Sequence, residues 1–139
     1  MNFPAPDHVY ECIPPFRDNR QLPPDEQIVI GIKALRSPEL DAFKVAAQQA
    51  RASALTTAQA EEEIARLNLK LVSSKIVFIR NVHIEDLGEV TDFDTLFRVA
   101  PLALVEWVIR APLSTEELMR SEKHKFNQPG PARSQGGAE

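Results

Sequence analysis

The segment between Pro101 and Pro112 restricts the possible folds most, because almost every residue between its two prolines is apolar. Proline is favoured at the first position of a helix and cannot continue one. The segment therefore predicts a short helix that Pro101 opens and Pro112 ends. At about 100° per residue, its only charged stripe consists of Glu106 and Arg110, in the favourable i, i+4 order. A helix that is apolar around most of its circumference normally lies in a core, so we expect the fold to be built around this segment.

The apolar sides of this helix raise the question of what covers them. The chain of 139 residues can bury a modest single core, and one interpretation is that the whole helix is core. The other is that a partner or a second copy covers one side, since large aromatic side chains and exposed apolar area are typical of interfaces. We expect the core side to carry Leu102, Val105 and Ile109. The expected partner-binding residues are Leu104, Trp107 and Val108, with Phe97 and Leu118 adjoining.

One strand is expected before the helices, because apolar residues alternate within "EQIVIGIKAL". Gly31 would weaken the interior of this strand or mark a bulge. A second β-branched run, residues 75–82, fits either a strand that pairs with the first or a continuation of the preceding helix. We favour a helix that continues to about Ile79. The alternating residues of the first strand are Ile28, Ile30 and Ile32.

Two longer helices are expected between these β-branched runs. Ser37 is the expected N-cap of a helix over residues 38–52, whose first position is a proline. A T-x-x-Q capping box that begins at Thr56 predicts a second helix that reaches at least Ser73. The buried side of the first helix is expected to carry Leu40, Phe43 and Ala47.

Turn and capping patterns also place two helices around the proline-bounded one. A turn is expected around Gly88, and a capping box that begins at Thr91 predicts a short helix after it. A further capping box at Ser114 opens a final helix to about Lys125. The expected fold class is mainly α with a minor β element (α+β), a small single-domain helical protein with an extended N-terminal arm.

Proline and glycine divide the chain into three parts. More than half of the 11 prolines lie before residue 27, and such a segment cannot form a regular helix. We interpret residues 1–26 as an extended arm that lies across a surface, with a loose tail as the alternative. Residues 27–126 form the expected globular domain with one strand. Residues 127–139 are rich in proline, glycine and serine, and we expect a disordered tail.

The sequence lacks the residue patterns of a catalytic or metal site. Cys12 is the only cysteine, which excludes an internal disulfide and a cysteine-rich zinc site. His83 near Glu85 and Asp86 is the nearest approach to a metal site, but such strings are common in turns. We therefore expect no enzyme, no catalytic residue, no cofactor and no metal.

Charge and hydropathy argue against two other classes of partner. The net charge is -4, and no basic face is evident, so nucleic-acid binding is not expected. No apolar run approaches membrane-spanning length, and the N-terminus lacks the pattern of a signal peptide. These features predict a soluble intracellular protein.

The order of these segments resembles the tail assembly chaperones of long-tailed bacteriophages. The stretches that carry the resemblance are "ALRSPELDAF" (34–43), "NVHIEDLGEVTD" (81–92) and the segment from Pro101 to Lys125. With the helix between them they cover about two thirds of the chain. The sequence departs from the family in its longer proline-rich arm and in "KHKF", where asparagine commonly follows the lysines.

The resemblance implies a function that needs no cofactor. Proteins of this family bind the tape measure protein in the host cytoplasm and keep this long helical chain soluble until the tail tube forms around it. A longer form, made by frameshifting, is thought to recruit the tail tube protein. Independently of the resemblance, the apolar helix between Pro101 and Pro112 fits a homo-oligomer, in which a second copy covers one of its sides. The alternative is a virion structural or connector protein of the neck or minor tail, whose N-terminal arm clasps neighbouring subunits.

Overall fold

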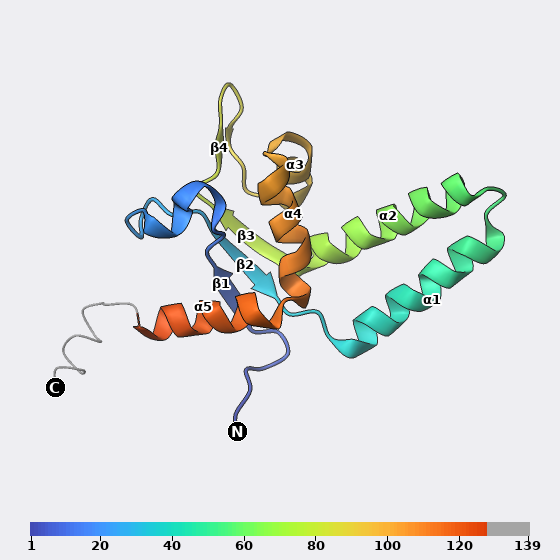
Figure 1. The fold of residues 1–139 in the computed structure, drawn as a ribbon, viewed down its shortest axis with the longest axis horizontal. Coiled ribbons are helices and arrows are strands. Elements are labelled where there is room, and N and C mark those ends of the chain that lie inside the picture. Colours follow the sequence, from blue (N-terminus) through green and yellow to red (C-terminus); the bar gives the residue numbers. More distant parts are fainter. Residues whose placement is uncertain (128–139) are drawn as a thin grey trace.

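The fold is an α+β domain in which helices pack against a small antiparallel sheet (Figure 1). The structure, a computed structural model, describes the backbone of residues 1–127 and the side chains of residues 1–122. The expected fold class, mainly α with a minor β element, is confirmed. The tail expected for residues 127–139 lies, apart from Asn127 at the end of a helix, outside the described residues.

The sheet has three antiparallel strands in the order β1-β2-β3. Residues that face each other across the strands share one side of the sheet, so the pairs Cys12–Ile30 and Ile30–Ile79 define the side that faces the core. All three side chains are buried. The strands are β1 (Val9–Cys12), β2 (Val29–Lys33) and β3 (Ile76–Arg80).

The opposite side of the sheet carries Gly31, and the ring of Phe78 lies directly over it. A Cβ atom added at Gly31 would stand 2.9 Å from Phe78 Cζ and closer still to two other ring carbons, so a larger residue does not fit beneath this ring. The register shifts between Gly31 and Ile32, which is the kind of irregularity that a glycine inside a strand suggests. The guanidinium carbon of Arg80 stacks 4.8 Å from the centre of the same ring.

The β-branched run after α2 is strand β3, and the expected continuation of the helix to Ile79 is wrong. The helix ends at Lys75, and Ile76 has extended dihedral angles, φ -93° and ψ 114°. Pairing with β2 decides the outcome, because it buries Ile79 on the core side to 4% exposure and suits β-branched side chains. The expectation of a single strand is also wrong, since β1 and β3 flank β2 on both sides.

The N-terminal segment packs on its own domain through β1 and the 3-10 helix η1 (Phe16–Gln21). Asn19 is buried and holds the loop after β1: its amide donates to the carbonyl oxygens of Pro14 at 2.8 Å and Ile28 at 3.0 Å. Arg20 donates to Glu117 on the C-terminal helix at 2.8 Å. The expected extended arm is thus an edge strand of the sheet over residues 9–12, and the loose-tail alternative does not hold there.

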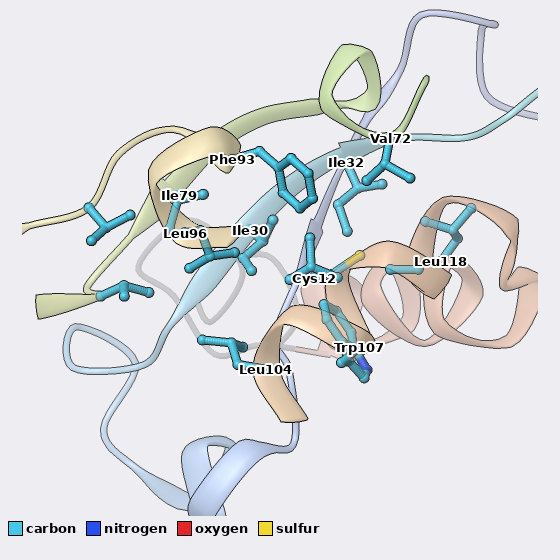
Figure 2. Packing of buried hydrophobic residues seen from close by; sticks show 14 residues of the cluster. Cys12, Ile30, Ile32, Val72, Ile79, Phe93, Leu96, Leu104, Trp107 and Leu118 are labelled. Carbon is cyan, nitrogen blue, oxygen red and sulfur yellow. The ribbon is translucent and has the colours of Figure 1, made fainter. Parts of the chain in front are cut away.

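Three helices cover the core side of the sheet (Figure 2). Asp92, rather than the expected Thr91, caps the first of them, because its carboxylate accepts a hydrogen bond from the Thr95 amide at 3.0 Å. Pro101, expected as the first residue of the second, occupies its cap position, so this helix begins one residue later than expected. Ser114 caps the third as expected. The helices are α3 (Phe93–Val99), α4 (Leu102–Arg110) and α5 (Thr115–Asn127), with the short 3-10 helix η2 (Ala111–Leu113) between the last two.

A two-stranded hairpin, β4 (His83–Ile84) and β5 (Gly88–Glu89), contains the turn expected around Gly88. Gly88 has a φ of 95°, a conformation that other residues adopt only with strain. Val82 and Val90 are buried at its base, where the Val90 amide donates to the Val82 carbonyl at 2.8 Å. The rest of the hairpin extends beside α3 (Figure 1).

A second, larger hairpin connects β2 to β3 and consists of the helices α1 (Ser37–Ser53) and α2 (Thr57–Lys75). Helix α1 was expected close to these bounds, and α2 was expected to begin here but to continue to about Ile79. Arg36, rather than the expected Ser37, occupies the N-cap position of α1. Thr56 caps α2 as expected: its hydroxyl accepts a hydrogen bond at 3.1 Å from the amide of the third helical residue.

Candidate functional site

Helix α4 lies in the middle of the core, and the side expected to bind a partner is buried (Figure 2). Leu104 and Val108 are 1% and 0% exposed, and Trp107 is 9% exposed. Leu118 on α5 belongs to the same buried cluster. These four side chains have almost no surface to offer a partner, so the expected assignment of the two sides of α4 is corrected.

The physical reason is the place of α4 over the sheet. The core side of the three strands needs apolar cover, and α4 is the most apolar of the described helices, so it turns most of its circumference inward. Leu102, expected in the core, is instead exposed on the same edge as Glu106 and Arg110, whose outward orientation was expected. Of the five expected partner-binding residues, only Phe97 is substantially exposed, at 43%.

The surface that sequence reasoning missed lies on the α1–α2 hairpin, which projects from the body of the molecule (Figure 1). The two helices pack chiefly on each other, so one side of each apolar stripe stays uncovered. Ala47 is buried as expected, whereas Leu40 and Phe43 are only half-buried. Alanines at the contact let the two helices approach closely, and the larger apolar side chains remain at its margin.

An apolar groove of about 740 Å³ lies between α1 and α2 and extends to the turn that joins them. Phe43 contributes to it from α1, and Ile64 and Ala65 contribute from α2. Leu55, in the turn, is 89% exposed at the end of the groove. The other lining residues are Arg51, Ala54, Thr56, Thr57, Ala60, Glu61 and Asn68. Grooves of this kind bind the apolar face of an amphipathic helix.

The two walls of the groove carry opposite charge. Arg51 stands on the α1 wall and Glu61 on the α2 wall, and neither makes an ion pair within residues 1–122. Because the helices are antiparallel, residues seven positions farther from the turn are again level with each other, and these are Lys44 on α1 and Asn68 on α2. The groove therefore carries one positive side chain on its α1 wall and one negative side chain on its α2 wall, among apolar residues such as Phe43 and Ile64.

The base of the hairpin is fixed by Lys75, a buried lysine at the end of α2. Its ammonium group donates to the carboxylate of Glu39 in the first turn of α1. This hydrogen bond holds the pKa of Glu39 below its ordinary value, and the Arg36 amide, which donates to the same side chain at 2.9 Å, acts in the same direction. The pair joins the two helices beside the sheet and leaves the groove at the far end of the hairpin accessible.

The reactive side chains singled out in the sequence, Cys12 and the string of His83, Glu85 and Asp86, lie in different parts of the described fold. Burial raises the pKa of the Cys12 thiol to about 12, so the nucleophilic thiolate is scarcely populated near neutral pH. His83, Glu85 and Asp86 are all exposed on or next to the β4–β5 hairpin. Within the part of the chain that the structure describes, no three His, Cys, Asp or Glu side chains are grouped so that they could hold a metal ion. None of the described helices combines the length and apolar character needed to cross a bilayer.

No protein-family model, curated protein or solved structure matches this chain. The candidate site therefore rests on its own residues. The sequence did contain a signal for it: Ala46, Ala47, Ala50 and Ala54 recur at helical spacing along α1, and such a stripe predicts a close contact with another helix. Sequence reasoning gave most weight to the aromatic residues around Trp107 and therefore missed the groove.

Proposed function

We propose that the protein is a tail assembly chaperone of a long-tailed bacteriophage, which binds the tape measure protein in the host cytoplasm and keeps it soluble. The observation that carries the proposal is the apolar groove on the projecting α1–α2 hairpin. A groove outside the core can bind a client without any rearrangement of the fold. The family resemblance of residues 34–43, 81–92 and 101–125 supports the same function.

The dimensions of the groove suit a helical client. From Phe43 to Ala54 the α1 wall rises by roughly 16 Å, which is about three turns of helix. A client helix with apolar residues at i, i+3 or i+4, i+7 and i+11 would place them along the groove, from Phe43 past Ile64 to Leu55. Each bound copy would cover one stretch of the apolar stripe on a long helical client, and several copies would keep the whole chain soluble.

Contact alone accounts for this function, so the proposal includes neither a cofactor nor a catalytic step. Recruitment of the tail tube protein, the second partner that the resemblance implies, is assigned to an extension joined after Phe126. The connector alternative needs a free arm. Val9–Cys12 are already paired with β2, so the exposed end of the arm that precedes the sheet is residues 1–7. This favours the chaperone.

The test is co-expression with a tape measure protein, the client that the proposal names. Ala65→Glu places a charge in the groove, and Ala58→Glu places the same charge on an exposed position of α2 that does not line it. We expect the native chain and Ala58→Glu to bring the client into the soluble fraction and to co-purify with it, and Ala65→Glu to lose most of both effects.

Two results would contradict the proposal. One is that Ala65→Glu, with unchanged far-UV circular dichroism, solubilises the client as well as Ala58→Glu does. The other is that mass spectrometry of purified particles finds this chain in stoichiometric amounts, as expected of a connector. A chaperone would be absent from the particles.

A further inference from the structure

The groove of the α1–α2 hairpin is self-complementary in charge, because its α1 wall carries a positive side chain and its α2 wall carries a negative one. Arg51 and Glu61 lie near the joining turn on different helices. A second copy turned by 180° about an axis parallel to the helices would lay its α2 along α1 and its α1 along α2. Such a two-fold contact is isologous: each residue pair that meets once meets twice.

We infer that a second copy of this chain covers the groove when no client is bound, so that two hairpins form a four-helix bundle. In this arrangement Arg51 of each copy meets Glu61 of the other, which makes two ion pairs at the rim of the groove. Seven residues farther from the turn, Lys44 meets Asn68, so no like charges are opposed there. The apolar floor at Phe43 is then covered on both copies.

The length and the side chains of the hairpin fit this occupant. Helices of 17 and 19 residues extend for roughly 25 and 29 Å, as in the helices of short antiparallel bundles. Ala54 and Ala65 at the rim allow a second helix to approach closely. Leu55, otherwise almost fully exposed, gains an apolar neighbour in the corresponding turn of the second copy.

A second copy and a client helix would then use the same surface and compete for it. The free protein would keep its apolar groove covered, and a client would have to displace one copy to bind. This inference does not rest on the identity of the client: if the protein is a monomer that nevertheless solubilises the client, the inference fails and the proposed function stands.

The experiment is sedimentation equilibrium of the full chain, without client, from the low micromolar to the high micromolar range. We expect a monomer–dimer equilibrium. Arg51→Glu and Glu61→Arg should each weaken it about tenfold or more, because both ion pairs become like-charge contacts. The double variant Arg51→Glu/Glu61→Arg should restore the native dissociation constant. Ala65→Glu should abolish the dimer, and the matched control Ala58→Glu should leave it unchanged.

Far-UV circular dichroism of each variant checks that the hairpin is still folded. A chain that is monomeric at every concentration overturns the inference. A dimer that responds to neither charge reversal, or that the double variant does not restore, also overturns it, because the contact must then lie elsewhere on the molecule.

Discussion

The close contact between Gly31 and the ring of Phe78 gives the sharpest test of the sheet. Gly31→Ala would place a methyl group 2.9 Å from Phe78 Cζ and nearer still to two other ring carbons, so the half-buried ring must move. Overpacking of this kind costs about 1–3 kcal/mol, and removing a glycine from a strand interior returns about 0.5–1 kcal/mol. We expect the free energy of unfolding to fall by about 1–2 kcal/mol.

The sign of the effect should reverse when the ring is absent. In a Phe78→Ala background the three ring carbons nearest to the methyl group are gone, so Gly31→Ala should stabilise the protein by about 0.5–1 kcal/mol, the backbone term alone. The assay is urea unfolding followed by the fluorescence of Trp107, the single tryptophan, which is buried in the core. The double-mutant cycle then gives the coupling between the two positions directly.

Gly88→Ala provides the matched control. Gly88 has a φ of 95° and no atom within 4 Å of an added Cβ, so its replacement acts through the backbone and should cost the same with or without Phe78. The reasoning is refuted if Gly31→Ala destabilises the protein equally in both backgrounds, since the ring would then not be the obstacle.

Three further outcomes are expected. Trp107→Asp with Val108→Lys should unfold the protein, because both side chains are buried in the core; a folded double variant by circular dichroism would put them back on the surface. The Cys12 thiol, buried and with a pKa raised to about 12, should react with a thiol reagent only after denaturant is added, and rapid reaction of the native protein would contradict its burial. Because the pKa of Glu39 is lowered in the folded state, its carboxylate stabilises the fold. This contribution to the free energy of unfolding is complete above the ordinary glutamate pKa of about 4.3 and is lost as the pH falls through the pKa of Glu39 in the folded protein. The stability difference between the native chain and Lys75→Met, measured by urea unfolding, should therefore shrink below about pH 4 and stay constant above it; a constant difference throughout would show that Glu39 gains nothing from Lys75.

The sequence correctly predicted the features that depend on residues close together in the chain, namely helix caps and most helix bounds. The capping boxes at Thr56 and Ser114 are present as hydrogen bonds, and both the helix of residues 37–53 and the start of the helix of residues 57–75 lie close to where they were expected. In each case the donor and the acceptor are only a few residues apart, so the sequence pattern contains the whole interaction.

The errors concern contacts between distant parts of the chain. Strand β3 depends on β2, which lies more than forty residues before it, and a short β-branched run has the same periodicity in either conformation. Which side of α4 is buried depends on the sheet and on Cys12 from the N-terminal segment. The groove of the candidate site needs two helices at once, so neither helix alone could reveal it.

The place of the α1–α2 hairpin in the topology has a consequence for how this protein can be altered. Strands β2 and β3 are antiparallel neighbours, a pair that a turn of 2–5 residues would ordinarily join. The helical hairpin is in effect a long insertion at that turn. Its helices can lengthen or shorten by whole turns without changing the pairing of the sheet. A version in which a short turn replaces residues 37–75 would separate the two roles of the chain, because the body would lose the groove and, of the buried core cluster, only Val72.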